Sequence, residues 1–321
     1  MNKQIFTGKT HICLMISAAI IAVALIMSVF GLGMNLGIDF TGGSLLTYDM
    51  GTEFDVTVVE EALKAAGITE SQIAKTGDGE VKTGLQIRTK DLGDKTGDMR
   101  EAFEAKLAET YPAAAFVTID QVGAVAGRDL ISNAVISCLI VFVCLLIYIA
   151  IRFDFNSGLA ALAALAHDIL IMVSLMVFTR SIYQVNSPFI AAVLTIIGYS
   201  INNTIVIFDR IRENNRLLDY KEGSRKGVVE VSVRQTLSRT INTTVTTLVT
   251  LVALYILGVD SIREFTFPLI VGMLAGVYSS VMLSGQIWAH WVDHDTFAFV
   301  RNLFKRKSGK KVKKAKKAKK A

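Results

Sequence analysis

Six long runs of uncharged, mainly apolar residues constrain this chain more than any other feature of its sequence. They cover roughly residues 12–34, 130–151, 157–179, 187–208, 239–259 and 265–290 of the 321. A helix rises ~1.5 Å per residue, so about 20 residues cross the ~30 Å hydrocarbon layer of a membrane. The first run is longer than the ~7–15 residue apolar region of a signal peptide. The sequence therefore predicts a polytopic α-helical membrane protein with six transmembrane helices, the first of them uncleaved.

Lysine and arginine predict how these helices are oriented, because they gather in short loops on the cytoplasmic side. Arg152 follows the second run, a basic loop at 209–238 follows the fourth, and a basic tail follows the sixth. All three lie on one side if both termini are cytoplasmic. This reading divides the chain into a cytoplasmic N-terminus with helix 1 (1–36), an outer domain (37–129), helices 2–6 (130–292) and a basic cytoplasmic tail (293–321).

The segment between the first two runs has the pattern of a small α+β domain. A strand-like "GGSLLTYDM" is followed by an amphipathic helix ending at Gly67, a hairpin around "GDGE", a second helix ending at Pro112 and a last strand in "AAFVTIDQVGAV". The order β-α-β-β-α-β is that of the ferredoxin-like split unit. We expect an extracytoplasmic binding or mechanical domain, since it contains no cysteine pair, histidine cluster or phosphate-binding loop.

Charge and cysteine usage argue against several functions. The last 21 residues hold 12 of the 34 Lys and Arg and no acid, so the basic character belongs to a tail. A nucleic-acid-binding surface would carry its basic residues on the fold, and none is expected. The three cysteines lie in apolar runs without metal-ligand spacing. No nucleophile–base set is present, so the sequence predicts no enzyme, metal or cofactor.

Two glycine patterns indicate points of flexibility and of close packing. "GIDFTGG" joins the first run to the outer domain, and its side chains can form a local turn while its glycines allow a hinge. The hinge residues are Gly37, Asp39, Phe40, Thr41, Gly42 and Gly43. In the sixth run, small residues recur every four positions, which favours close helix packing in a membrane. This stripe is Gly272, Gly276, Ser280 and Ser284.

Polar residues inside the apolar runs are the candidates for an ion pathway. His167 and Asp168 lie about ten residues from either end of the third run, where an ionisable residue is costly and normally faces protein or water. Asn202 and Asn203 adjoin in the fourth run and are expected to face inward, and Asp209 and Arg210 mark its cytoplasmic end. The fifth run begins at Arg239 with a stripe of threonines that includes Thr243, although threonine alone can bond its own helix backbone.

Three motifs resemble the SecF family of bacterial protein-export subunits: "GIDFTGG", "GYSINNTIVIFDRIREN" and "LSRTINTT". The resemblance extends over about residues 10–292. It implies a half-bundle similar to RND-type transporters, a location in the bacterial inner membrane, a SecD partner, association with the SecY channel complex, and preprotein substrates. It also implies that a proton or sodium gradient promotes late translocation.

One position departs from the family pattern. Sequences of this family typically read "GYSxNDT", with an Asp that takes part in ion coupling, and this chain has Asn203 there. An amide cannot carry a proton at physiological pH. Two alternatives therefore remain beside the coupling subunit: a non-conducting scaffold for SecD, or an RND-type exporter of small molecules or lipids. Within this chain Asp168 is the best-placed group to carry a proton.

Overall fold

The computed structural model describes residues 6–68, 71–77, 83–89, 96–217, 225–258 and 260–294. The basic tail and the centre of the "GDGE" turn lie outside these ranges. Within them, six helices are long and apolar enough to cross a membrane, as predicted. They are α1 (Thr10–Val29), α5 (Ala124–Arg152), α6 (Phe155–Phe178), α7 (Ser187–Leu217), α8 (Lys226–Leu257) and a sixth rod made of α9 (Asp260–Ser279), a π-turn (Ser280–Ser284) and α10 (Gly285–Asp293).

Three of these rods form the centre of the bundle. Burial covers 67%, 50% and 44% of the most apolar windows of the α9–α10 rod, α7 and α6, against 6–11% for α1, α5 and α8. The small-residue stripe explains the central packing, because it lets two backbones approach. A Cβ added at Gly272 would lie 2.7 Å from Ile196, and one at Gly276 would lie 3.0 Å from Ser200, both on α7.

The loop predicted at 209–238 is instead largely helical. Helix α7 continues to Leu217 and α8 already begins at Lys226. The apolar residues of these two helix extensions are buried in the same core as the membrane-spanning segments. They include Ile211, Val229 and Val233. A hydropathy window detects only the part of a helix that lipid surrounds, so these amphipathic extensions beyond the apolar runs were missed.

The outer domain is the predicted ferredoxin-like unit. Its elements are β1 (Gly43–Asp49), α3 (Val56–Ala65), β2 (Ser71–Thr76), β3 (Gly84–Thr89), α4 (Thr96–Thr110) and β4 (Ala115–Val122). The strands form one antiparallel sheet in the order β2-β3-β1-β4. Side chains of α3 and α4 pack on one face of the sheet around Tyr48, Phe103 and Leu107. Within the described parts of this domain, no helix lies on the opposite face of the sheet.

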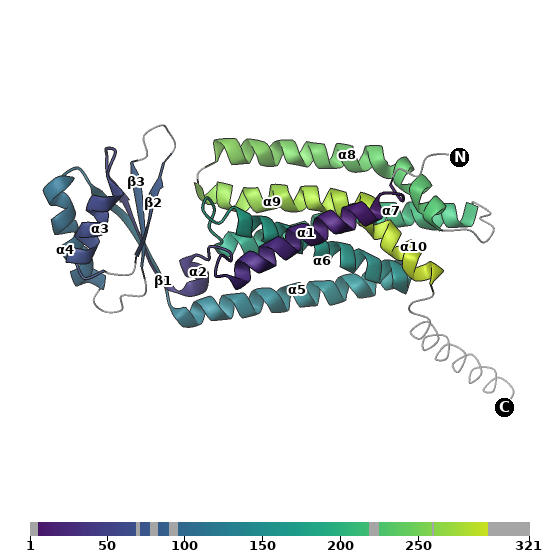
Figure 1. Ribbon diagram of the computed structural model, residues 1–321, viewed down its shortest axis with the longest axis horizontal. Coiled ribbons are helices and arrows are strands. Elements are labelled where there is room, and N and C mark those ends of the chain that lie inside the picture. Colours follow the sequence, from purple (N-terminus) through teal and green to yellow (C-terminus); the bar gives the residue numbers. More distant parts are fainter. Residues whose placement is uncertain are drawn as a thin grey trace, which may run out of the picture.

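Figure 1 shows the sheet domain at one end of the bundle, while α1 begins and α10 ends at the other. The short helix α2 (Ile38–Thr41) connects α1 to β1. On the return path only Gly123 separates β4 from α5. A Cβ added at Gly127 of α5 would lie 2.7 Å from the Phe40 carbonyl oxygen, so α2 and α5 touch backbone to backbone. The domain is thus joined to the bundle at α2 and at the start of α5.

Candidate functional site

Asp168 lies in the centre of the bundle on α6 and is fully buried. Its Oδ2 accepts a hydrogen bond of 2.6 Å from Ser200 Oγ on α7. Its Oδ1 lies 3.1 Å from Nδ1 of the neighbouring His167. A carboxyl group in such a place must find polar partners, because burial without them is costly. The structure therefore brings the two ionisable residues predicted from the third run into direct contact.

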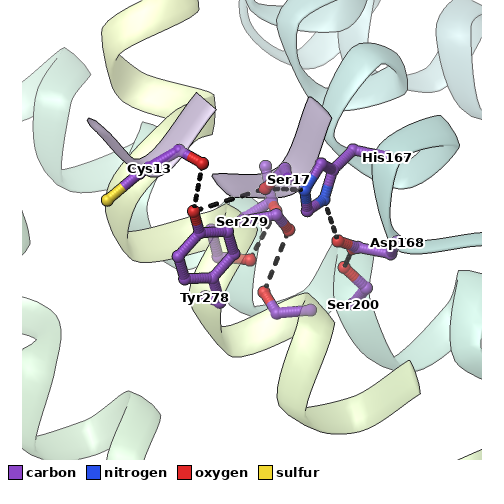
Figure 2. Close-up of polar contacts among 10 residues, drawn as sticks. Cys13, Ser17, His167, Asp168, Ser200, Tyr278 and Ser279 are labelled. Atoms are coloured by element: carbon purple, nitrogen blue, oxygen red, sulfur yellow. Dashed lines mark hydrogen bonds and ion pairs between the residues drawn. The ribbon is translucent and has the colours of Figure 1, made fainter. Parts of the chain in front are cut away.

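The contacts continue from His167 to the first helix. His167 Nε2 lies 2.8 Å from Ser17 Oγ on α1, and Ser17 Oγ lies 3.3 Å from the Tyr278 hydroxyl on α9. The Tyr278 hydroxyl in turn lies 2.7 Å from the Cys13 carbonyl oxygen. The rings of His167 and Tyr278 are stacked, with centroids 5.8 Å apart. Figure 2 shows this chain of contacts, which joins four helices.

The direction of each hydrogen bond in this chain follows from its last member. The Cys13 carbonyl can only accept, so Tyr278 donates its single hydroxyl proton there and accepts from Ser17. Ser17 has then used its own proton, so it must accept from His167 Nε2–H. One more proton is needed between Nδ1 of His167 and Asp168. Either Asp168 is protonated or His167 is an imidazolium, and both forms hold the same number of protons.

Loss of that proton removes one hydrogen bond from this chain of contacts. With Asp168 ionised and His167 neutral, Nδ1–H must donate to Asp168, so Nε2 becomes an acceptor. Ser17 then donates to His167 and no longer to Tyr278. The single proton of the Tyr278 hydroxyl can serve either Ser17 or the Cys13 carbonyl, so one of these two contacts is lost. The protonation state of the His167–Asp168 pair is thus linked to a contact between α1 and α9.

Buried hydroxyl groups extend from Asp168 along the packing stripe. Thr204 lies one turn after Ser200, and its Oγ1 is 2.9 Å from Ser280 Oγ. Ser284 Oγ donates to the Ser280 carbonyl at 2.8 Å. Ser280 and Ser284 open and close the π-turn, and such turns in α-helices are frequent at functional sites. The stripe that packs α7 against the α9–α10 rod therefore also carries a row of buried hydroxyl groups that begins next to Asp168.

The other predicted ion-pathway residues form a separate group on the far side of α7. Asn203 is buried, and no described residue accepts from its Nδ2. Asn202, Arg239 and Thr243 are exposed on the outside of the bundle. The expectation that both asparagines face inward was wrong for Asn202, because adjacent helical residues point about 100° apart.

Antiparallel packing of α7 and α8 explains what Asn203 faces. The Tyr199 hydroxyl donates to the Thr243 carbonyl at 3.1 Å. One turn further along both helices, Asn203 and Thr240 come level with each other. Thr240 is also buried, and its Oγ1 has no partner among the described residues. Asn203 therefore belongs to the α7–α8 interface and not to the Asp168 chain.

The "GIDFTGG" segment docks on the bundle before it turns into the sheet. Asp39 accepts a 2.7 Å hydrogen bond from the Ser187 backbone N–H and another from the Ser187 hydroxyl, at the start of α7. Its predicted role in a local turn was wrong, whereas Thr41 does bond locally to the Gly37 carbonyl at 3.0 Å. Positive φ angles follow at Gly42 (73°) and Gly43 (130°), which favour glycine. A hinge here can involve only residues beyond the docked Asp39.

Replacing Asp39 with Ala is expected to loosen this docking. Ser187 would lose an ionised acceptor, at a cost of about 1–3 kcal/mol. Amide hydrogen exchange should then accelerate at Ser187 and in α2, while the core of the sheet domain stays protected. The control Thr41→Val removes two hydrogen bonds within the segment, to the Gly37 and Gly42 carbonyls, and should leave exchange at Ser187 unchanged. Unchanged exchange at Ser187 in Asp39→Ala would contradict the docking role.

Asp209 and Arg210 connect helices at the other end of the bundle. Asp209 Oδ1 lies 3.6 Å from Arg152 Nη2 on α5. Arg210 Nε donates to Gln235 Oε1 on α8 at 2.7 Å. Exposed pairs of this kind contribute only about 0–1 kcal/mol each. They align α5, α7 and α8 without reaching the buried chain at Asp168.

Sequence reasoning missed Ser17, Ser200 and Tyr278. Ser17 is a single polar residue in an apolar run, whereas Ser200 and Tyr278 lie in short polar clusters. Serine in a membrane helix usually bonds its own backbone, so none of the three stands out. Nothing in the sequence pairs Ser17 with His167, which is 150 positions away. Among the described residues, no group of three or more His, Cys, Asp or Glu side chains is placed to hold a metal ion.

A six-helix bundle with a buried ionisable pair and a ferredoxin-like outer domain defines a polytopic membrane protein with an RND-like half-bundle. Residues 102–294 match the family model "Protein export membrane protein SecD/SecF, C-terminal", and residues 28–58 match the "SecD/SecF GG Motif". The chain belongs to the SecD/SecF family. This confirms the resemblance that its motifs indicated.

Several named relatives are similar over most of the chain. The "Protein translocase subunit SecF" of Calditerrivibrio nitroreducens is 33% identical, over 88% of this chain and 92% of its own length. The "Protein translocase subunit SecDF" of Bacillus subtilis is 34% identical over 90% of this chain, which spans only 38% of that protein. The crystal structure of SecDF from Thermus thermophilus, described as a translocon-associated membrane protein, matches with a TM-score of 0.78 and 32% identity, over 90% of this chain and 38% of that one.

Proposed function

We propose that this chain acts with a SecD partner in protein translocation and couples proton movement to late steps of that process. Its relatives are named protein translocase subunits, which favours this function over export of small molecules or lipids. The observation that supports the coupling role is the buried chain of contacts from Asp168 to Cys13, in which uptake or release of one proton would change a contact between α1 and α9. No catalytic residue is required.

The proton is the coupling ion that this site fits. Asp168 offers one carboxyl group, and both of its oxygens already have partners in His167 and Ser200. A sodium ion needs several oxygen ligands, which membrane transporters supply from carboxylates and unwound backbone. A hydrogen-bonded pair that holds one proton suits proton exchange. Asn203, which cannot titrate, takes no proton in this scheme.

A SecD partner would cover the polar side of α7 and α8. Asn202, Arg239 and Thr243 are exposed on helices that are long and apolar enough to span a membrane, and polar groups within a membrane normally face protein or water. In the Bacillus subtilis relative, a region similar to this chain is part of a longer SecDF protein. We infer that SecD packs on this side and supplies partners for these side chains. The SecY channel complex and unfolded preproteins are the further partners of this function.

The proposed location is the bacterial inner membrane, with both termini and the α7–α8 hairpin in the cytoplasm and the sheet domain outside. The basic residues near the hairpin support this orientation. The variant Glu213→Cys is made in a background that lacks the three native cysteines. It is expected to react with a membrane-impermeant maleimide only after the spheroplast membrane has been permeabilised. A cysteine at Glu109 should react in intact spheroplasts. Labelling of both from one side would refute the orientation.

Reconstituted vesicles test the coupling role directly. Vesicles would contain the SecY channel complex and SecD, with or without this chain, and the release of a translocated preprotein would be measured with and without an imposed proton gradient. We expect the gradient to accelerate release only when this chain is present. Full stimulation without it would refute the function. Stimulation that needs the chain but survives Asp168→Asn would favour the scaffold alternative, in which SecD alone conducts.

A further inference from the structure

A groove runs along helix α5 between two points at which this helix closely approaches its neighbours. At the outer point, a Cβ added at Gly127 would lie 2.7 Å from the Phe40 carbonyl oxygen of α2. At the other point, a Cβ added at Gly158 of α6 would lie 3.1 Å from Leu146 Cδ1 and 3.6 Å from the Leu146 carbonyl oxygen of α5. Between these two contacts, side chains of α5, α6 and α7 line a groove of about 580 Å³.

The groove is apolar along its whole length. Ile131 of α5, Leu170 of α6 and Phe189 of α7 are typical of its lining, and the Cys138 thiol is the most polar side-chain group among the lining residues. A water molecule needs roughly two to four polar partners, which this lining does not offer. An unfilled groove would forfeit dispersion contacts along its walls. In a membrane the groove therefore takes up hydrocarbon.

The length of the groove matches one leaflet of a bilayer. Its α5 wall extends from Ile131 to Phe142, and these eleven residue steps span roughly 17 Å at ~1.5 Å per residue. One leaflet takes half of the ~30 Å hydrocarbon layer, or about 15 Å. The wall lies mainly in the half of the apolar run 130–151 that is nearer to the sheet domain. The groove is thus about as long as one acyl chain of the leaflet on that side.

The groove opens towards lipid and away from the surface on which SecD is inferred to pack. Among the described spans, α5 has the least buried apolar window, at 6%, and its groove residues Val135 and Leu139 are exposed. Figure 1 shows α5 and α8 at opposite edges of the bundle. The exposed polar residues that call for a SecD partner lie on α7 and α8. A lipid chain, and not a helix of SecD, is therefore the hydrocarbon within reach.

A basic side chain lies at the outer end of the groove. Arg180 follows α6, and its Nη1 donates to the Gly31 carbonyl oxygen at 3.4 Å. Asn35, which stands between two lining residues of the groove, donates to the Arg180 carbonyl oxygen at 3.3 Å. A guanidinium carries five N–H donors, so Arg180 can also bind a phosphate through charge-assisted hydrogen bonds. A phosphate bound there lies at the end of the groove where the acyl chain of a phospholipid begins.

We propose that this groove binds one acyl chain of a phospholipid from the leaflet on the sheet-domain side, with the lipid phosphate at Arg180. The acyl chain fills the space between α5 and the α6–α7 pair. It therefore supports α5, the helix that follows β4 with only Gly123 between them. This lipid site goes beyond the proposed translocase function, because it requires only that the chain spans a membrane.

Native mass spectrometry of the purified chain, alone and in complex with SecD, tests this site. Both samples are extracted in mild detergent and activated until loosely held lipids are lost, and the unmodified chain is expected to keep one phospholipid in each. Val135→Trp fills the groove and should lower this occupancy about tenfold, the effect of losing roughly two buried CH₂ groups of the acyl chain. The matched control, Val143→Trp, changes an exposed residue of α5 that does not line the groove and should keep the lipid.

Two further variants complete the test. Ala134→Phe fills the groove from another position of α5 and guards against misfolding of Val135→Trp, with the unfolding temperature in detergent as the check on both. Arg180→Gln leaves the groove open but removes the charge. The unmodified chain should prefer a phospholipid to a diacylglycerol with the same acyl chains, and Arg180→Gln should lose this preference. Inorganic phosphate should not displace the lipid.

Three results would overturn the lipid site. They are the absence of a retained phospholipid on the unmodified chain, equal retention by the unmodified chain and both groove-filling variants, and release of the lipid when SecD binds. Release by SecD would show that a protein segment covers the groove. None of these results bears on whether the chain promotes translocation, so the translocase function is tested separately.

Discussion

Replacing Asp168 with Asn is expected to remove the gradient-dependent part of preprotein release while leaving the protein folded. The amide can accept from Ser200 through its oxygen and donate to His167 Nδ1 through its nitrogen. It therefore reproduces every hydrogen bond of the protonated site and cannot release a proton. Tyr278 therefore keeps its contacts with both Ser17 and the Cys13 carbonyl. Release measured with an imposed gradient should fall to the rate measured without one.

The control for this variant is Asp209→Asn. Asp209 is also an acid, but it lies on α7, is exposed and pairs with Arg152 among the described residues, so its replacement should preserve gradient stimulation. Unfolding temperature and co-purification with SecD should match the unmodified chain in both variants. Gradient stimulation that survives Asp168→Asn in assembled complexes would show that the proton crosses elsewhere.

Replacing Gly276 with Val is expected to damage both the packing and the proton site. A Cβ at this position lies 3.0 Å from the Cβ and the Oγ of Ser200, which is too close for unstrained contact. Overpacking of a close interface costs about 1–3 kcal/mol. Helix α7 must then move away from α9, and Ser200 moves away from Asp168. We expect a lower unfolding temperature in detergent together with a loss of gradient stimulation.

Gly198 provides the matched control. It lies on α7 close to Ser200, and a Cβ added there meets no atom within 4 Å. The same change to Val should leave stability unchanged or raise it slightly, since Gly is about 1 kcal/mol worse than Ala inside a helix. Equal unfolding temperatures for Gly198→Val and Gly276→Val would contradict the packing role of the stripe.

The six spans and the outer domain could be predicted because their signals are local and repeated. Each apolar run carries its own evidence of length, and the outer domain repeats strand and helix patterns with clear stops at Gly67 and Pro112. The ends of α7 and α8 could not be predicted, because Leu217 and Lys226 lie in polar sequence that folds as helix only through tertiary packing.

The candidate site could be predicted only in part. His167 and Asp168 were found because charge inside an apolar run is rare. Their partners depend on which helices meet, and no local pattern encodes that Ser17 of α1 lies beside α6. The same reason explains the error at Asn202. A pair of adjacent amides indicates polarity at that depth, but which of the two faces the bundle is decided by the packing of α7 against its neighbours.

The single residue between β4 and α5 has a mechanical consequence. Helix α5 extends over 29 residues, or roughly 44 Å at ~1.5 Å per residue, and it touches α2 near its outer end at Gly127. That contact would act as a fulcrum, with a long arm towards Arg152 and a short arm towards the sheet. A large sideways motion of α5 at Arg152 would produce a smaller displacement at β4. The force at β4 would be correspondingly larger. Such a lever is better suited to holding a polypeptide against a pulling force than to moving it over a long distance.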